Sequence, residues 1–233
     1  MKTQQIDVDV ILLDQGETFM FGNDRFGREQ DFAATYRNIG GALLSDAEVH
    51  DTISTTVEAL LVAYDSGQAD DRFPTVHDIL AASTTLSETE MDFLDDVIAE
   101  HEVGTISSQH RETIHQLAET HRLGIISNVF AQPARFEHNL QQAGILGCFD
   151  HIVWSSAHGV IKPSPRIFHI AIEHWAIEPD RILYVGNDAK RDVGGSKGVG
   201  MKSAWINLHE AKRPPGIPEP EVTLNDLSEL VLV

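Results

Sequence analysis

The sequence predicts an α/β protein in which a doubly wound parallel sheet carries an inserted all-helical cap domain. Three observations support this fold class. Short apolar runs recur along the chain, segments with a helical period lie between the later runs, and about a hundred residues of helical pattern follow the first run. Alternation of strand and helix is typical of a parallel sheet with helices on both faces.

Each predicted strand is a short run rich in β-branched residues, and polar residues or glycine bound it on both sides. Such runs are typical of strands buried in a parallel sheet. The five predicted strands are Val8 to Leu13, Leu123 to Ser127, Ile152 to Trp154, Ile182 to Val185 and Ser203 to Ile206.

Three predicted helices lie between the later strands, at Gln109 to His121, Pro133 to Ala143 and Ser164 to Trp175. In the third, Ser164 is the expected N-cap and Pro165 occupies the first helical position, where its missing N–H costs nothing. Strand and helix alternate from about residue 107 onward. This order indicates right-handed βαβ units.

Between the first two strands the sequence predicts helices, two of which begin at capping boxes, Ser45/Glu48 and Ser87/Glu90. A helical insert in this place is best explained as a cap over the carboxyl ends of the strands, where open α/β sheets bind ligands. We therefore predict a core domain of residues 1–20 and 107–233 and a cap domain of residues 21–106. The Pro-rich residues 213–220 predict a surface linker to a final short helix.

The charge balance excludes some classes of partner. Lys and Arg total 17 against 36 Asp and Glu, which gives a formal net charge of -19. Such a charge repels nucleic acid and anionic membrane surfaces, so we expect neither as a partner.

Cysteine content and hydropathy predict a cytoplasmic protein. Cys148 is the only cysteine, so the chain forms no internal disulfide, as is typical of a reducing compartment. The N-terminal residues MKTQQIDVDV lack the long apolar run of a signal peptide. No apolar stretch approaches the ~18 residues that a membrane span needs.

Four polar features follow four of the predicted strands in turn. Asp14 ends the first strand, Ser127 and Asn128 end the second, Lys162 follows the third, and the acidic loop Gly186 to Asp192 follows the fourth. Each feature alone is typical of a turn or a helix cap. Because the carboxyl ends of parallel strands share one edge of a sheet, their recurrence there predicts a single site.

This order of Asp, Ser, Lys and acidic loop resembles the four motifs of the haloacid dehalogenase superfamily. The resemblance covers residues 6–20 and 107–207, whereas residues 21–106 match only as a helical cap. It implies a Rossmann-like core in which the first and fourth strands are neighbours. It also implies a hydrolase, and most often a phosphatase acting on a small phosphorylated metabolite.

The resemblance implies a role for each motif. Asp14 is the nucleophile that forms an aspartyl-phosphate, and Ser127, Asn128 and Lys162 bind the phosphoryl group. Mg²⁺ is held by Asp14, the carbonyl of Gly16 and the fourth motif, here Asn187 and Asp192. The charges agree with this assignment, because a carboxylate attacks an anionic phosphate only when a metal and an ammonium offset the repulsion.

Two positions depart from the family pattern. Phosphatases of the family usually carry a general acid/base Asp two residues after the nucleophile, where this chain has Gly16. Its loss costs about 10²–10⁴-fold in rate, which predicts a slow phosphatase or one that needs a good leaving group. Glu17 is adjacent, but in an extended segment it points elsewhere. Asn187 replaces the first Asp of the fourth motif, so we expect weak Mg²⁺ binding.

Two other functions fit the sequence. A 2-haloacid dehalogenase needs no metal and no acid at Gly16, because halide leaves without a proton. A catalytically degenerate family member would act as a binding protein, and Gly16 and Asn187 favour that alternative. A receiver-type signalling domain needs only about half this length and no cap.

Overall fold

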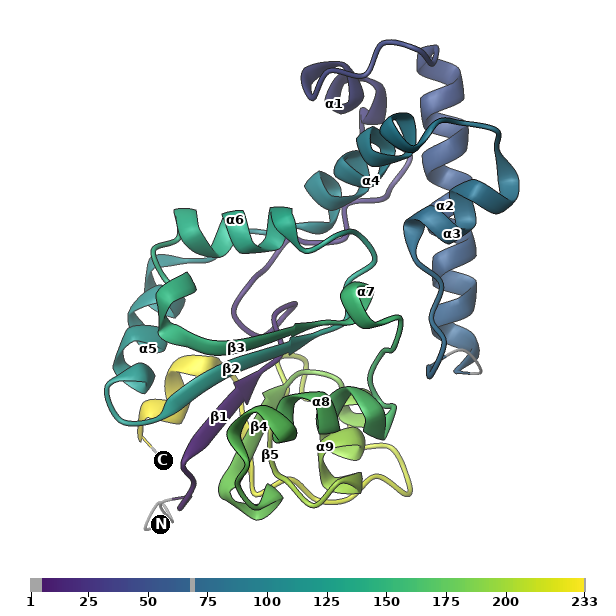
Figure 1. The fold of residues 1–233 in the computed structure, drawn as a ribbon. Helices are drawn as coiled ribbons and strands as arrows, with labels where there is room; N and C mark the ends of the chain where they lie inside the picture. Colours follow the sequence, from purple (N-terminus) through teal and green to yellow (C-terminus); the bar gives the residue numbers. More distant parts are fainter. Residues whose placement is uncertain (1–5, 68–69, 233) are drawn as a thin grey trace.

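The computed structural model describes residues 6–67 and 70–232. Its centre is one six-stranded sheet, parallel throughout, with the order β3-β2-β1-β4-β5-β6 (Figure 1). The strands are β1 (Val10–Leu13), β2 (Arg122–Ser127), β3 (Phe149–Trp154), β4 (Ile182–Gly186), β5 (Lys202–Ile206) and β6 (Val222–Leu224). The predicted fold class is confirmed, and β1 lies between β2 and β4.

Five strands were expected from apolar runs, and a sixth is present. β6 follows the predicted Pro-rich linker and pairs with β5 through Ala204↔Val222, Trp205↔Thr223 and Ile206↔Leu224. Of its three residues only Leu224 is buried, so the strand lacks the apolar run by which the others are recognised. The final helix that we predicted after the linker is a 3₁₀ helix at Leu227–Leu232.

Alternate residues of β1 enter two different apolar clusters. Ile11 and Leu13 belong to a cluster that also holds side chains of α5 and α6, and Val10 and Leu12 pack with α8. Helices therefore cover both faces of the sheet, as a doubly wound fold requires. The core helices are α5 (Ser108–Ala118), α6 (Ala134–Gln142), α7 (Ser155–His158), α8 (Pro165–Trp175) and α9 (Gly195–Gly198). Ser164 caps α8 and Pro165 is its first residue.

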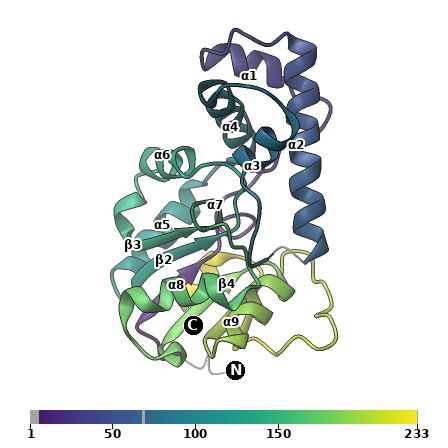
Figure 2. The ribbon, with the colours of Figure 1, turned by 45° about the vertical axis from the view of Figure 1, so that its right-hand side comes forward.

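The insert between β1 and α5 is helical throughout its regular elements. Figures 1 and 2 show its four helices grouped beside the carboxyl ends of the strands, with the long α2 running back toward the core. They are α1 (Phe32–Asn38), α2 (Asp46–Ser66), α3 (Val76–Ser83) and α4 (Glu88–Glu102). Its two connections to the core meet at an antiparallel bridge between Phe21 and Thr105. The domain boundaries at residues 20/21 and 106/107 stay a prediction.

Only one of the two expected capping boxes is complete. In the first, Ser45 and Glu48 exchange both hydrogen bonds at the start of α2. In the second, Ser87 accepts a bond from the Glu90 N–H, but Glu90 is buried and its Oε1 has no partner among the described residues. A third box that we did not predict, Thr75 with Asp78, opens α3. In the described part of the chain, no helix is both long and apolar enough to cross a bilayer.

Two acidic side chains of α4 fasten the insert to the loop after β2. Glu102 accepts hydrogen bonds from the N–H groups of Phe130 (2.6 Å) and Ala131 (3.0 Å), and Asp95 accepts one from Gln132 (3.0 Å). Burial raises the pKa of Asp95 to about 6, and it raises the pKa of Glu102 well above its usual value. The insert and the loop that follows Asn128 are thus coupled through buried carboxyl groups.

Asp95→Asn is expected to remove part of the pH dependence of stability. The folded protein holds the Asp95 proton up to about pH 6, but the unfolded chain releases it near its ordinary pKa of 3.8. The free energy of unfolding therefore falls as pH rises from about 4 to 6, by about 3 kcal/mol for this group. Asn keeps an oxygen acceptor for Gln132, so the variant should be the more stable protein at pH 7.5.

Urea denaturation of wild type and variant at pH 4.5 and pH 7.5 measures this effect. Asp96→Asn is the matched control, because Asp96 is the exposed neighbour on the same helix. An equal difference between wild type and Asp95→Asn at both pH values would contradict the assignment.

Candidate active site

The polar groups at the carboxyl edge of the sheet line one cavity of about 170 Å³. Asp14 continues the pairing of β1 with β4, because its N–H donates to the carbonyl of Val185 at 2.8 Å. The predicted residues at the cavity wall are Asp14, Gly16, Ser127, Asn128, Lys162, Asn187 and Asp192. Side chains from widely separated parts of the sequence therefore meet at one place.

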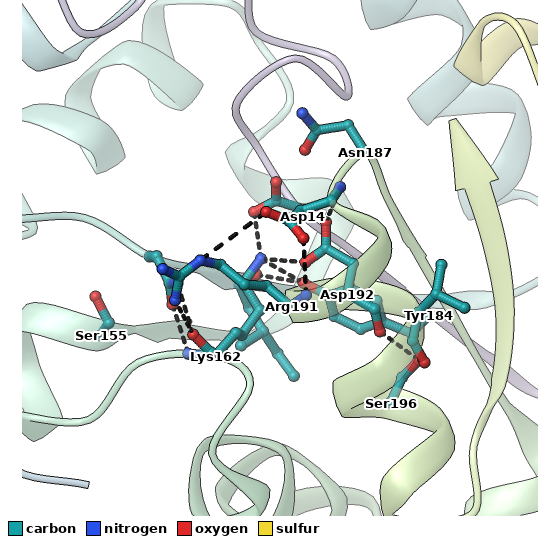
Figure 3. Close-up of polar contacts among 12 residues, drawn as sticks. Asp14, Ser155, Lys162, Tyr184, Asn187, Arg191, Asp192 and Ser196 are labelled. Atoms are coloured by element: carbon teal, nitrogen blue, oxygen red, sulfur yellow. Dashed lines mark hydrogen bonds and ion pairs between the residues drawn. The ribbon is translucent and has the colours of Figure 1, made fainter. Parts of the chain in front are cut away.

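Lys162 is the centre of the hydrogen-bond network in this cavity. Its Nζ donates to Asp14 Oδ1 (2.7 Å), Asp192 Oδ1 (2.8 Å) and the Tyr184 hydroxyl (2.8 Å), as Figure 3 shows. All three ammonium donors are used, which fixes the position of the charge. Tyr184 in turn donates to the carbonyl of Ile126 at 2.8 Å. The sequence did not mark Tyr184, because it lies inside an apolar strand and reads as a core residue.

The ion pairs around Lys162 are buried. The exposed fraction of the side chain is 3% for Lys162, 11% for Asp14 and 1% for Asp192. Burial by itself lowers the pKa of Lys162, but the Asp14 and Asp192 carboxylates raise it well above its ordinary value. Burial raises the pKa of Asp192 to about 6, although Lys162 opposes that rise. The site thus holds a permanent cation between two carboxyl groups.

The loop after β4 folds so that Asp192 returns to the edge of the sheet. Asp188 caps the π-helical turn Ala189–Gly194 by accepting from the N–H groups of Lys190 and Arg191, and Asp192 Oδ2 accepts from the Asp188 N–H at 2.8 Å. A side chain at Gly186 would collide with the Asp192 carboxylate, which explains the glycine. Asn187 lines the cavity, but in the described residues no hydrogen bond joins its side chain to Asp14 or Asp192 (Figure 3).

Asn128, expected to bind substrate, holds the backbone of Lys162. Its Oδ1 accepts from the Lys162 N–H at 2.8 Å, and its Nδ2 donates to the Lys162 carbonyl at 3.2 Å. Arg191 donates to the same carbonyl and to the carbonyl of Tyr64 in α2, and its guanidinium carbon lies 3.6 Å from the Tyr64 ring centroid. The sequence analysis did not identify Arg191 or Tyr64 as residues of the site. Arg191 had a signal, since it is a cation inside the acidic fourth motif.

The segment after Asp14 is not extended. The expectation that Glu17 points away from the site assumed an extended segment, and this assumption is wrong. Glu17 has a positive φ of 52°, so the chain turns there and Glu17 lines the cavity with Asp14. A Cβ atom at Gly16 would lie 3.1 Å from Asn23 Nδ2. The side-chain amide of Asn23 therefore lies next to the position where related phosphatases have their general acid/base Asp. Asp24 also lines the cavity. Partial desolvation raises its pKa to about 6, and Asp14 and Glu17 add to the rise.

The donor groups at the cavity suit a hard divalent cation. Five carboxyl groups line it against two cationic side chains, Lys162 and Arg191, which leaves an excess of negative charge. Mg²⁺ takes oxygen ligands, and carboxylates, an amide oxygen and a backbone carbonyl are all present. Within residues 6–67 and 70–232, no three His, Cys, Asp or Glu side chains already converge on a metal position. Asp14 and Asp192 instead converge on Lys162.

Comparison with known proteins gives both relatives and structural neighbours. The chain is 38% identical to pyrimidine 5'-nucleotidase YjjG of Escherichia coli over 111 residues, which is 47% of this chain and 48% of that protein. It has a TM-score of 0.64 with a HAD phosphatase from Thermococcus onnurineus, at 21% identity and 96% coverage of each chain. It also has a TM-score of 0.64 with a 2-haloacid dehalogenase from Pseudomonas syringae, at 19% identity, with 97% of this chain and 98% of that chain covered.

Both structural neighbours share the fold, which agrees with the predicted Rossmann-like core. The match to the nucleotidase spans about half of each chain. A family model described as haloacid dehalogenase-like hydrolase matches residues 30–206, a range that includes Ser127, Lys162 and Asp192 and begins after Asp14. This chain belongs to the haloacid dehalogenase-like hydrolases.

Proposed function

We propose that this hydrolase is a cytoplasmic, Mg²⁺-dependent phosphatase that cleaves small phosphate monoesters through an aspartyl-phosphate at Asp14. The observation that carries the proposal is the contact of Lys162 Nζ with Asp14 Oδ1 at 2.7 Å on the wall of an acidic cavity. An ammonium bound to one carboxylate oxygen fixes the carboxylate and leaves the second oxygen for attack.

Asp14 Oδ2 is the attacking atom in this proposal. Among the described residues it has no hydrogen-bond partner, whereas Oδ1 is held by Lys162. Oδ2 forms a bond to phosphorus as the bond from phosphorus to the ester oxygen breaks. The leaving oxygen keeps the electron pair and takes a proton. Water then attacks the phosphorus of the aspartyl-phosphate, which releases phosphate and restores the Asp14 carboxylate.

Charge neutralisation is the contribution of the surrounding side chains. Lys162 offsets negative charge on the transferring phosphoryl group, and the hydroxyl of Ser127 orients one of its oxygens from the wall of the cavity. When Mg²⁺ is bound, by Asp14, the Gly16 carbonyl, Asn187 and Asp192, it supplies further positive charge for the same purpose. Tyr184, Asn128 and Arg191 act on Lys162 itself, by holding its Nζ or its backbone.

The leaving group receives less help than in phosphatases that have an acid two residues after the nucleophile. Gly16 has no side chain, so proton donation to the ester oxygen falls to water or to another group in the cavity. We expect esters with good leaving groups to react faster than alkyl esters, by up to about 10²–10⁴-fold.

The relatives support phosphate over halide as the group that is removed. The nucleotidase, which is the more similar in sequence, acts on a phosphate ester by its name, but the dehalogenase shares only the fold at 19% identity. The oxygen-rich cavity also suits the metal that phosphate chemistry needs more than it suits a metal-free dehalogenase.

Two assays on the purified protein test the proposed function. We expect phosphate release from p-nitrophenyl phosphate that requires Mg²⁺ and stops with EDTA, and no halide release from 2-chloropropionate. Halide release without metal would replace the proposal with a dehalogenase. Inactivity in both assays, together with a phosphatase screen that finds no substrate, would favour a binding protein.

A further inference from the structure

A second cavity of about 140 Å³ adjoins the phosphate cavity and has a different character. Asp24, Tyr64 and Asn128 line both cavities, so a molecule whose phosphate lay at Asp14 would reach the second cavity past these residues. The rest of its wall is Phe26, Leu61, Glu102 and Phe130. No Lys, Arg or His side chain is among the described residues that line it.

Contacts with neighbouring side chains fix the aromatic residues Tyr64 and Phe130 in the wall of the second cavity. Tyr64 and Phe130 meet edge to face at a centroid distance of 6.0 Å, and Phe73 stacks on Phe130 at 5.9 Å with an interplanar angle of 11°. Arg191 lies over the Tyr64 ring, and Asn128 donates to the Tyr64 hydroxyl at 3.4 Å. Such a preorganised wall favours a planar ring over a flexible chain.

The cap side of the second cavity leaves apolar surface uncovered. Leu61 in α2 is 43% exposed, and a wider groove of about 740 Å³ continues from the second cavity along Leu61 and Phe26. Leu61 and the neighbouring Val62 are both exposed and both line this groove, so its apolar wall suits an apolar group of a ligand. The size is informative too, because a cavity of about 150 Å³ with an apolar lining holds one benzene ring.

We propose that the second cavity is the leaving-group subsite and that it binds one planar, uncharged ring. This inference rests on the proposed function, and it narrows the substrates to phosphate monoesters whose leaving group carries such a ring. A leaving group that bears a carboxylate or a second phosphate would lose its hydration there and find no cationic side chain to pair with among the described residues that line the cavity. Hydroxy acids and amino acids are therefore poor leaving groups for this enzyme, and aryl or single-ring heterocyclic compounds are good ones.

Equilibrium binding of benzylphosphonate and ethylphosphonate, measured by calorimetry with Mg²⁺ present, tests the subsite without any turnover. The two ligands share the phosphonate and differ by the ring. We expect benzylphosphonate to bind at least about 10-fold more tightly, since even one methylene in a fitted apolar pocket changes discrimination by about 10-fold. Equal binding of the two ligands overturns the proposal.

The variant Leu61→Trp tests whether the ring binds in the second cavity, and Val62→Trp is its matched control. The first change fills the second cavity from α2. The second adds the same bulk at a 66% exposed neighbour that lines only the wider groove. We expect Leu61→Trp to abolish the preference for the ring and to leave ethylphosphonate binding unchanged, whereas Val62→Trp retains the preference. Loss of the preference in both variants, or in neither, contradicts the assignment.

Failure of the subsite and failure of the proposed function give different results. If the subsite assignment is wrong, Mg²⁺-dependent phosphate release persists but the ring has no effect on binding. If the proposed function is wrong, phosphate release is absent or unaffected by Asp14→Asn, whatever the binding of the ring.

Discussion

Asp14→Asn is expected to lower phosphate release by about 10⁴-fold or more, because the variant has no carboxylate to attack phosphorus. Its fold should persist. Asn keeps an oxygen that accepts from Lys162 Nζ, and the buried cluster then holds one carboxylate and one ammonium instead of two carboxylates and one ammonium. We expect the free energy of unfolding to change by less than about 1 kcal/mol.

Steady-state kinetics with p-nitrophenyl phosphate measures the rate of phosphate release. A urea denaturation curve of the same preparation measures the free energy of unfolding. Glu17→Gln is the matched control, since Glu17 lines the same cavity but is bonded to neither Lys162 nor Asp192 in the described structure. If the Asp14→Asn protein unfolds at a much lower urea concentration than wild type, the loss of phosphate release results from a damaged fold. It then does not support Asp14 as the nucleophile.

Lys162→Met has the second large expected effect, on stability as well as on rate. The change removes the cation that Asp14 and Asp192 share and leaves two buried carboxylates facing each other. Removing one partner of a buried ion pair costs about 3–5 kcal/mol. Phosphate release should be lost too, because no ammonium remains to offset charge on the phosphoryl group.

A double-mutant cycle separates these causes. Lys162→Met combined with Asp192→Asn should recover part of the stability, since one uncompensated charge has been removed, yet phosphate release should stay absent. The free energies of unfolding of the four proteins measure the coupling between residues 162 and 192. A coupling near zero would mean that the buried pair at 2.8 Å does not stabilise the fold.

The strands and their polar ends were predictable from sequence because both depend on local pattern. Apolar runs with polar boundaries locate β1, β2, β4 and β5 to within a few residues, and each run fixes where its chain leaves the sheet. Parallel strands end at a common edge, so the sequence predicted Asp14 and Lys162 at the same edge of the sheet, although Lys162 lies eight residues after β3 and β2 separates β3 from β1. β6 could not be found this way, since it is short and half-exposed.

The supporting side chains were not predictable, because their roles come from contacts over long stretches of chain. Tyr184 reads as a core residue of β4, and only the fold places its hydroxyl 2.8 Å from Lys162 Nζ. Tyr64 lies in α2, and its carbonyl accepts a hydrogen bond from Arg191, which is 127 residues away in the sequence. Glu17 was expected to point away, because nothing in the sequence indicates the positive φ that turns it into the cavity.

Single-turnover trapping of a phosphoryl group on Asp14 shows whether this carboxylate is the nucleophile. Excess enzyme is mixed with p-nitrophenyl phosphate and Mg²⁺, quenched in acid and digested, and the peptide that contains Asp14 is weighed by mass spectrometry. We expect a transient peptide heavier by one phosphoryl group in wild type and none in Asp14→Asn. Phosphate release at the wild-type rate from Asp14→Asn, with no phosphorylated peptide in either protein, would contradict this expectation.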